Sequence, residues 1–346
     1  MSTNSNHYTR RKFLKLGGAA LGGLAIGSFV VPWQKRVAQP QAQVTILKAA
    51  SYSQDLFDLL RRGLQNYPAV LERVRGGQVV LKPNIVDHYD THPVNTNPAV
   101  IAAAVAVFRH YGAAEVIVAE GPGHRRDTEM LLELSGVDEA LRQEKVRFVD
   151  LNLDAISPVP LAANYTQLGR MFFPNTILGA DLIVSLPKLK THHWSGVTLS
   201  MKNMFGTVPG VKYGWPKNLL HWRGIAESII DINMTLQPGF AIVDGVQGME
   251  GDGPLHGDVI NSGVIVMGDN LTAVDATAAR IMSVYPENID YLMYMMASFG
   301  GTINEHRIRQ SGENLADVRQ DFRVLDHMAF IKRPLPLTKK LLLLGW

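Results

Sequence analysis

Short apolar runs alternate with helical patterns along most of this 346-residue chain, and this alternation restricts the possible folds more than any other feature. The apolar runs are typical of buried strands. They lie at residues 44–50, 78–86, 115–121, 146–152, 181–190, 240–246 and 263–269. Helical spacing occurs between them, at 53–67, 97–112, 127–136, 219–236 and 272–284. The order predicts an α/β fold, with a mainly parallel sheet covered by helices on both faces.

The α/β region spans residues 44–330, which is enough for one large domain or for two lobes, 44–237 and 238–330. It contains no internal repeat. Residues 331–346 are basic and apolar, and we expect this tail to lie along a surface or a partner.

The first 43 residues have the composition of a targeting segment rather than of a folded domain. They contain six Lys or Arg, no Asp or Glu, and an apolar glycine-rich run. The start, TRRKFLK, places Arg10 and Arg11 in tandem and resembles a twin-arginine export signal. We therefore expect the twin-arginine translocase as a partner, and a location in the periplasm or on the outer face of the cytoplasmic membrane. No clear cleavage site precedes Val44, so the segment can also serve as a membrane anchor.

Without the export segment, the balance of charge and the absence of cysteine exclude several classes of function. Six of the 34 Lys and Arg residues lie in that segment, which leaves 28 against 31 Asp and Glu. A slightly acidic remainder argues against a nucleic-acid partner. The chain has no cysteine, which excludes disulfides, thiolate metal sites and a cysteine-ligated iron–sulfur cluster.

Polar clusters follow four of the predicted strands. Ligands in such folds bind beyond the carboxyl ends of the strands, so these clusters are expected to form one pocket. They contain Lys82, Asn84, Asp87, His88 and His92; then Glu120, His124, Arg125 and Thr128; then His192, His193, Lys202, Asn203 and His221; and finally Asp244, Glu250, Asp252 and His256.

Single histidines at strand ends more often complete a turn or cap a helix than react. That ordinary interpretation is favoured for His88, His92, His193 and His256. A group of such residues from several strand ends is harder to explain in this way, and His124, His192, Lys202 and His221 are therefore the preferred functional candidates.

The residues alone leave two further interpretations open. Asp87, His88, Asp244 and Glu250 can be ligands of a divalent metal, which would make the chain a metal-dependent hydrolase or lyase. Alternatively, Lys82, Arg125 and Lys202 can hold a small anion in a non-catalytic carrier or redox accessory protein.

Four segments resemble domain of unknown function family 362, and the resemblance covers essentially the whole chain after the export segment. They are KPN, LPKLKTH, TLSMKNMFG and DGVQGMEGDGP. The family implies no particular reaction. Some members carry a ferredoxin-like iron–sulfur module, which a chain without cysteine cannot have.

The stretch EGPGHRRDTEMLLELSG is similar to a strand-end segment of the nickel-pincer lactate racemase family. His192, Lys202, the pair Pro209-Gly210 and His221 match further elements of that family in chain order. Asn203, which follows the lysine, is typical of family 362.

The racemase resemblance implies a role for each matching residue. Lys202 would anchor a pyridinium mononucleotide whose sulfur and carbon atoms hold nickel, and His221 would complete the coordination of the metal. His124 and His192 would act as acid and base on the substrate hydroxyl. Lys82, Asn84, Arg125 and Asn203 are expected to help bind the cofactor or anion. The chain is thus expected to be an isomerase or redox enzyme for a small hydroxy acid or related anion.

Overall fold

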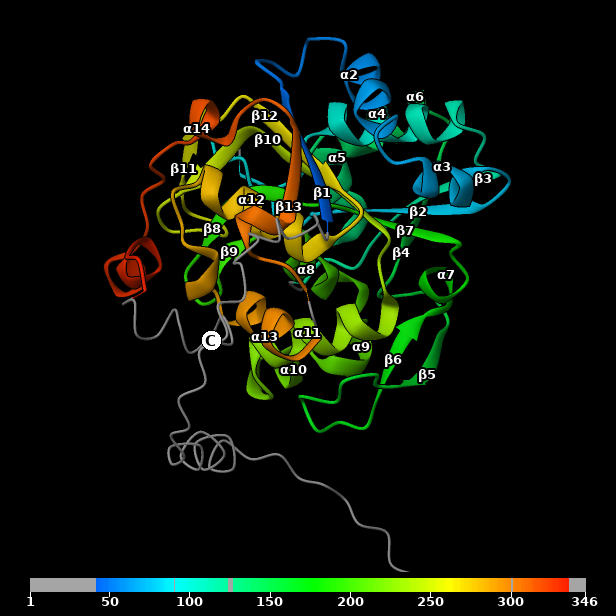
Figure 1. Cartoon of the computed structure of the whole chain (residues 1–346). Coiled ribbons are helices and arrows are strands. Elements are labelled where there is room, and N and C mark those ends of the chain that lie inside the picture. Colours follow the sequence, from blue (N-terminus) through cyan, green and yellow to red (C-terminus); the bar gives the residue numbers. More distant parts are fainter. Residues whose placement is uncertain (1–41, 90, 124–126, 300, 336–346) are drawn as a thin grey trace, which may run out of the picture. The chain divides into compact units, whose positions relative to one another are not determined.

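The computed structural model describes residues 42–89, 91–123, 127–299 and 301–335 (Figure 1). Nearly all of the predicted export segment, the candidates His124 and Arg125, and most of the predicted tail lie outside these residues, so those predictions stay predictions. No helix in the described ranges is long and apolar enough to cross a membrane.

One large mixed sheet organises the chain, with its main strands in the order β13-β1-β12-β10-β7-β2-β3-β4. These strands are β1 (Ala42–Lys48), β2 (Gln78–Pro83), β3 (Glu115–Glu120), β4 (Arg147–Asp150), β7 (Leu182–Leu186), β10 (Phe240–Glu250), β12 (Val264–Gly268) and β13 (Ile308–Gly312). Three further strands join through β10 and β8: β8 (Lys188–His192), β9 (Gly196–Thr198) and β11 (Asp258–Ile260). A separate antiparallel pair is formed by β5 (Ile156–Pro160) and β6 (Arg170–Pro174).

The prediction of a mainly parallel sheet is confirmed, with one antiparallel strand inside it. Strands β10, β7, β2, β3 and β4 pair in parallel. Strand β12 is antiparallel to both β10 and β1, because no helix lies between β10 and β12 to carry the chain back across the sheet. The β7–β10 pairing joins strands from both proposed lobes in one sheet, and the division into lobes stays a prediction.

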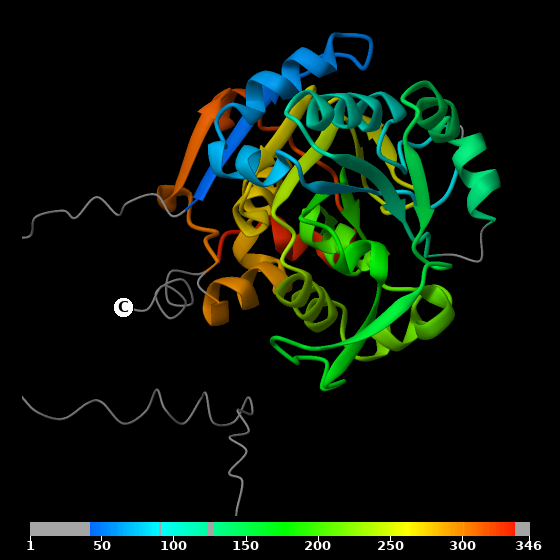
Figure 2. The same ribbon diagram turned by 90° about the vertical axis from the view of Figure 1, so that its right-hand side faces the viewer.

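Helices cover both faces of the sheet (Figures 1 and 2). One side carries α2 (Leu56–Leu64), α3 (Pro68–Val74), α4 (Pro98–His110), α5 (Thr128–Leu134) and α6 (Val137–Gln143). The other side carries α8 (Ser200–Asn203), α9 (Gly210–Tyr213), α10 (Asn218–Trp222), α11 (Ile225–Leu236), α12 (Leu271–Ile281) and α13 (Asp290–Phe299). The remaining helical elements are α7 (Asn175–Leu178), α14 (Leu315–Val318) and the 3-10 turns η1 (Met204–Thr207), η2 (Pro286–Asn288), η3 (Glu305–Arg307) and η4 (Asp326–Lys332).

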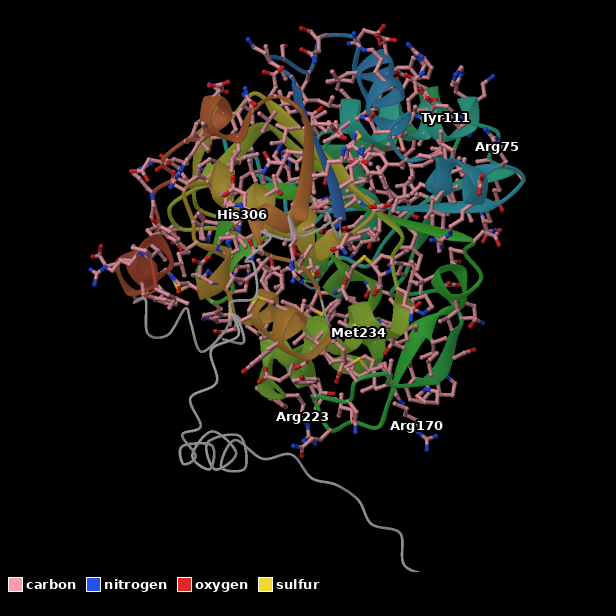
Figure 3. The ribbon with its side chains drawn as sticks, in the orientation of Figure 1. Arg75, Tyr111, Arg170, Arg223, Met234 and His306 are labelled. Atoms are coloured by element: carbon pink, nitrogen blue, oxygen red, sulfur yellow. The ribbon has the colours of Figure 1, made fainter. Side chains whose placement is uncertain are left out.

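Two hydrophobic cores fill the layers between the sheet and the helices. Neighbouring residues of β2 point to opposite faces, so that Val80 joins one core while Val79 and Leu81 join the other. Figure 3 shows the side chains in these layers, with the exposed Arg170 and Arg223 at the outer surface. The continuous apolar strands seen in the sequence are therefore strands that are buried on both faces.

Two predicted elements are each divided in the structure. The predicted strand 181–190 breaks at Pro187, which has no N–H for the ladder, and the chain continues as β8, paired with β10 rather than with β2. The predicted helix 219–236 breaks at Gly224, whose φ of 102° is not helical, and it forms α10 and α11. The first break produces β8, which ends at His192, and the second produces α10, which carries His221.

Candidate functional site

A cavity of about 220 Å³ lies where β2, β3 and β8 end. Eight residues of the predicted strand-end clusters line it, although they come from distant parts of the sequence: Lys82, Asn84, Glu120, His192, His193, Lys202, Asn203 and His221. The loop after β10 reaches the same cavity only through Pro254 and Leu255. The structure thus brings together the polar residues that follow three of the four strands chosen from the sequence.

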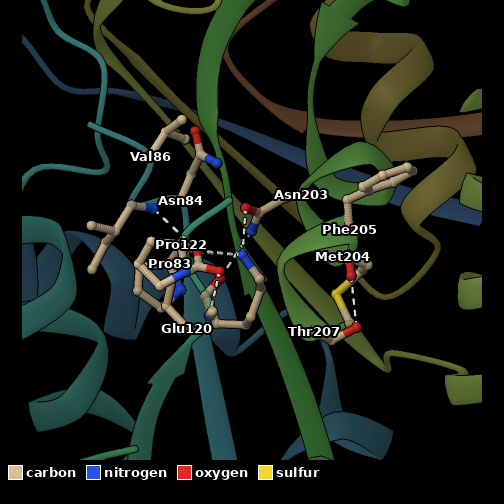
Figure 4. Close-up of polar contacts among 12 residues, drawn as sticks. Pro83, Asn84, Val86, Glu120, Pro122, Asn203, Met204, Phe205 and Thr207 are labelled. Carbon is tan, nitrogen blue, oxygen red and sulfur yellow. Dashed lines mark hydrogen bonds and ion pairs between the residues drawn. The ribbon is translucent and has the colours of Figure 1, made fainter. Parts of the chain in front are cut away.

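A buried ion pair forms one wall of this cavity (Figure 4). The Lys82 Nζ donates to Glu120 Oε2 at 2.5 Å, to Asn203 Oδ1 at 2.9 Å and to the Pro83 carbonyl at 2.7 Å. The other Glu120 oxygen accepts the Gly121 N–H at 2.9 Å. Burial lowers the pKa of Lys82, and the attraction of Glu120 opposes that shift. Because an ammonium has three N–H donors, Lys82 has none left for a ligand.

Asn203 belongs to the same wall. Its Nδ2 donates to the Lys82 carbonyl at 2.9 Å and to the Ser185 Oγ at 3.0 Å, while its Oδ1 accepts from Lys82. Both amide N–H donors are therefore used inside the protein. Lys82 and Asn203, expected from the sequence to bind the cofactor or anion, instead hold the end of β2 against α8.

Gly206 closes this wall. A Cβ placed on Gly206 would collide with the Glu120 carboxylate and the Lys82 ammonium. Only a residue without a side chain allows the backbone to come this close to the ion pair.

Lys202 lies in a different environment from Lys82. Helix α8, which carries it, is fixed by Asp275, whose carboxylate accepts the N–H groups of Ser200 at 2.7 Å and Met201 at 3.0 Å. The Lys202 Nζ lies 4.3 Å from the centre of the Phe205 ring, and no described residue forms a hydrogen bond or an ion pair with it. Burial, with repulsion from Lys82, lowers the pKa of Lys202 to about 8, against the attraction of Glu120.

Two further lysines line the cavity. The Lys190 Nζ donates to the Val94 carbonyl at 2.7 Å, and the Lys217 Nζ donates to the carbonyls of Gly121 at 2.8 Å and Phe205 at 3.1 Å. Burial lowers the pKa of Lys217 to about 7 and that of Lys190 well below its usual value. Among the described residues of the lining there are four lysines and one carboxylate, Glu120. Lysines thus outnumber carboxylates in the described part of this lining.

His192 is held in one protonation state. Its Nδ1 accepts the backbone N–H groups of Trp194 at 3.1 Å and Ser195 at 3.3 Å. A nitrogen that accepts two N–H donors carries no proton, so the neutral ring has its hydrogen on Nε2. Burial, with repulsion from Lys202, lowers the pKa of His192 well below its usual value. His192 is therefore a neutral N–H donor in the wall of the cavity.

The other two histidines of the lining have the opposite arrangement. The His193 Nδ1 lies 2.9 Å from the Gly253 carbonyl, and the His221 Nδ1 lies 3.1 Å from the Lys217 carbonyl. A carbonyl oxygen can only accept, so each Nδ1 carries the hydrogen and the neutral ring has its lone pair on Nε2. The exposed Trp194 packs edge-on against both rings, at 4.6 Å and 5.6 Å between ring centres.

Two polar atoms of the lining are buried without any hydrogen-bond partner in the described structure, the Asn84 Oδ1 and the Thr198 Oγ1. The two residues are only 7% and 4% exposed. The Asn84 backbone is fixed by Thr96 on both sides, at 2.9 Å each, so its side chain is held at this place. An unpartnered buried polar atom is costly, and one that lines a cavity marks a place for a ligand group or water.

The alternative metal ligands do not gather at this site. The Asp244 carboxylate accepts from Lys188 at 2.9 Å and from the Tyr52 hydroxyl at 2.9 Å, while Glu250 accepts from the Arg323 Nε at 2.6 Å. Asp87 and His88 do not line the cavity. Within the described ranges, no group of three or more His, Asp or Glu is placed to hold a metal. Contrary to the sequence-based suggestion, Asp87, His88, Asp244 and Glu250 do not form a metal site, because Asp244 and Glu250 are already paired with Lys188 and Arg323.

Sequence reasoning missed Lys190, Lys217 and Thr198 as site residues. A lysine inside an otherwise buried run, as in LPKLKTH, is itself a signal, because buried lysines are rare without a partner. Lys217 carried no such signal, since its contact with the Gly121 carbonyl joins residues 96 positions apart.

The fold and the site define an α/β protein with a lysine- and histidine-lined cavity at the carboxyl edge of a mainly parallel sheet. The chain belongs to the family described as "Domain of unknown function (DUF362)", whose model matches residues 79–280. The family prediction made from the sequence is therefore confirmed.

Two individual similarities accompany the family match. A thylakoid-associated protein of Synechocystis sp. is 25% identical over 257 residues, which cover 71% of this chain and 76% of that protein. Among solved structures, the lactate racemase apoprotein from Thermoanaerobacterium thermosaccharolyticum is similar with a TM-score of 0.42 and 14% identity. That match covers 69% of this chain and 57% of the racemase chain, so this chain spans little more than half of the racemase.

Proposed function

We propose that this protein binds a small organic anion in the cavity and acts on it as an enzyme of the lactate racemase-like type, with isomerase or redox chemistry on a small hydroxy acid. The observation that carries the proposal is the environment of Lys202. Its ammonium lines a lysine-rich cavity, with no hydrogen bond or ion pair to any described residue. A carboxylate is the simplest group that would satisfy it.

The unpartnered atoms near Lys202 favour a hydroxy acid over a plain carboxylate. The Asn84 Oδ1 can accept a hydrogen bond, and the Thr198 hydroxyl can donate or accept one. The His192 Nε2–H adds a donor on the same lining. A ligand with a carboxylate and a neighbouring hydroxyl would use all three groups, and a cavity of about 220 Å³ suits a molecule of that size.

Two residues fit the nickel-pincer nucleotide that the sequence motifs imply. A pKa of about 8 gives Lys202 a fraction of neutral amine near neutral pH, which covalent attachment requires. The hydrogen bond from the His221 Nδ1 to the Lys217 carbonyl fixes the tautomer whose Nε2 can bind a metal. Lys202 and His221 would therefore hold the group, which supplies a hydride acceptor when bound.

The remaining residues would act on the substrate itself. Lys202, or Lys190 or Lys217 if Lys202 is covalently occupied, would hold the carboxylate, while the Thr198 hydroxyl would orient the ligand hydroxyl by donating to its oxygen. His192 would donate a hydrogen bond from Nε2 to an oxygen that becomes negative during the reaction.

The test is the intact mass and metal content of the full chain purified from its native host, followed by binding and racemisation of D- and L-lactate. We expect a bound metal or small molecule, or direct lactate binding, that is lost in Lys202→Met. The matched control is Lys212→Met, because the exposed Lys212 also lies 4.3 Å from a phenylalanine ring, that of Phe172, but outside the cavity. Binding without turnover would favour a carrier, and the same bound species in Lys202→Met would contradict the proposal.

We further propose that the chain is exported by the twin-arginine translocase and is attached to a membrane through residues 1–43. The tandem Arg10 and Arg11 support export. The relative in Synechocystis is described as thylakoid-associated, which agrees with membrane attachment. Fractionation of the native cells, with and without a high-salt wash, tests the location.

A further inference from the structure

Two consecutive histidines of the β8–β9 hairpin line the same cavity, and their backbone hydrogen bonds fix opposite tautomers. The rings of His192 and His193 lie 4.9 Å apart between centres, with 41° between their planes, and both line the cavity. Their backbone partners differ in kind. Two N–H donors face the Nδ1 of His192, whereas a carbonyl acceptor faces the Nδ1 of His193.

The hydrogen bonds of His192 prevent it from taking a proton easily. To accept one on Nε2, the neutral ring would first have to place its hydrogen on Nδ1. That hydrogen would then face the N–H groups of Trp194 and Ser195, which lie 3.1 Å and 3.3 Å from the nitrogen. The imidazolium carries a hydrogen on both nitrogens, so its Nδ1 hydrogen would face the same two N–H groups. The hairpin would have to open before His192 could act as a base.

His193 is arranged for the opposite role. Its Nδ1 donates to the Gly253 carbonyl at 2.9 Å, and its own backbone N–H donates to the same oxygen at 2.9 Å. The ring is therefore held in the tautomer with the lone pair on Nε2. No described residue forms a hydrogen bond with that nitrogen, and a proton on it would leave the bond to Gly253 intact.

We propose that His193, and not His192, is the proton acceptor of this site. The inference rests on the proposed function, because it assigns the group that receives the hydroxyl proton of the bound hydroxy acid. In the step, the ligand O–H bond breaks and an N–H bond forms at the His193 Nε2. The ring becomes a cation and the ligand oxygen an alkoxide, so the total charge is unchanged.

The neighbouring residues suit both products of this step. The alkoxide would be stabilised by the Lys202 ammonium and by the His192 Nε2–H, which is fixed as a donor. The imidazolium would keep its bond to the Gly253 carbonyl, because that bond strengthens when the donor is charged. The hairpin thus supplies a fixed donor and a fixed acceptor from consecutive residues.

The first test measures the tautomers directly in the ligand-free full chain. Histidine would be labelled with ¹⁵N, and long-range ¹H–¹⁵N correlations would be assigned with the variants His192→Asn and His193→Asn. We expect His192 to carry its hydrogen on Nε2 and His193 on Nδ1. A hydrogen on Nδ1 of His192, or on Nε2 of neutral His193, would overturn the inference whatever the ligand is.

The second test compares lactate with propionate, which has the carboxylate but lacks the hydroxyl. The variant His193→Asn keeps a side-chain N–H for the Gly253 carbonyl and removes the Nε2 acceptor. Calorimetric titration should show that wild type prefers lactate, and that the preference falls about tenfold in His193→Asn, as expected for one lost hydrogen bond. A general disturbance of the pocket would weaken both ligands alike and leave the ratio unchanged.

The outcomes separate this inference from the proposed function. An unchanged preference for lactate in His193→Asn would overturn the role of His193 and leave the hydroxy-acid site in place. Failure of wild type to bind either ligand would overturn the proposed function itself, and the role of His193 with it.

Discussion

Lys202 and Asn203 are consecutive residues of one short helix, yet their side chains are used in opposite ways. Asn203 gives both N–H donors to the Lys82 carbonyl and the Ser185 hydroxyl, whereas Lys202 forms no hydrogen bond to any described residue. The hydrogen bonds of Asn203 thus fix the helix in the wall, and the fixed helix holds the Lys202 side chain in the lining of the cavity. This division of roles distinguishes the residues needed for folding from those available to a ligand.

Replacement of Lys202 by Met should abolish ligand binding and leave the fold intact. The variant loses one ring contact but also removes the cost of burying the Lys202 ammonium, so it should be at least as stable as wild type. Native mass spectrometry measures the ligand occupancy, and urea denaturation measures the free energy of unfolding.

Lys202→Arg should keep part of the binding if the lysine only holds an anion. It should keep none if the lysine amine is covalently attached, because guanidinium stays protonated. Unchanged occupancy in Lys202→Met would show that the ligand is held elsewhere.

Replacement of Lys82 by Met should have the opposite effect. It would leave the Glu120 carboxylate buried without its ionic partner, and breaking a buried pair in this way costs about 3–5 kcal/mol. Urea denaturation of Lys82→Met beside Lys202→Met compares two lysines of one cavity under the same conditions. Equal stabilities would mean that the Lys82–Glu120 pair does not support the wall.

The variant Gly206→Ala should destabilise the protein even though it adds only a methyl group. The new Cβ would meet the Glu120 carboxylate and the Lys82 ammonium, which have no space to move because both are buried. A loss of about 1–3 kcal/mol is expected from such a clash. Gly123→Ala is the control, since it lies in the same lining but its Cβ would meet no described atom closer than 3.9 Å. Similar melting temperatures for both variants would contradict this interpretation.

The sequence predicts the sheet and the place of the cavity for one physical reason. Strands buried on both faces must be continuously apolar, so they are easy to find, and the polar residues that follow them must lie at one edge. His192, Lys202 and His221 were found in this way. What a polar residue does there depends on its partners, which the pattern does not contain.

Asp244 illustrates the limit of this reasoning. It follows a buried strand like the other candidates, but Lys188 and Tyr52 come from 56 and 192 residues away to take its carboxylate. The state of His192 is likewise decided by two backbone N–H groups of the turn after it. Neither fact follows from residue type or spacing.

The proposed export depends on residues 1–43, nearly all of which lie outside the described structure. Replacement of both Arg10 and Arg11 by Lys should leave the full-length precursor in the cytoplasm, because the twin-arginine pathway reads the arginines and not their charge. Immunoblots of cell fractions would measure this. Normal translocation of the double variant would show that residues 1–43 use another route.

Anion binding should weaken as the pH rises through about 8, because that is the pKa to which burial lowers Lys202. Above this pH the amine is neutral and its attraction to a carboxylate is lost, so the affinity falls by up to tenfold per pH unit.

The stability of the unliganded protein should change in the opposite sense, increasing with pH. Between about 8 and the ordinary value of 10.5, the unfolded chain binds more protons at Lys202 than the folded chain does, so the free energy of unfolding rises with pH across that window. Below about pH 8, the buried ammonium destabilises the fold to its full extent. Titration calorimetry with lactate, and urea denaturation, on wild type and Lys202→Arg measure both trends. The arginine variant should bind without this pH dependence, since it stays charged. A wild-type affinity that is constant through this range would mean that Lys202 does not hold the anion.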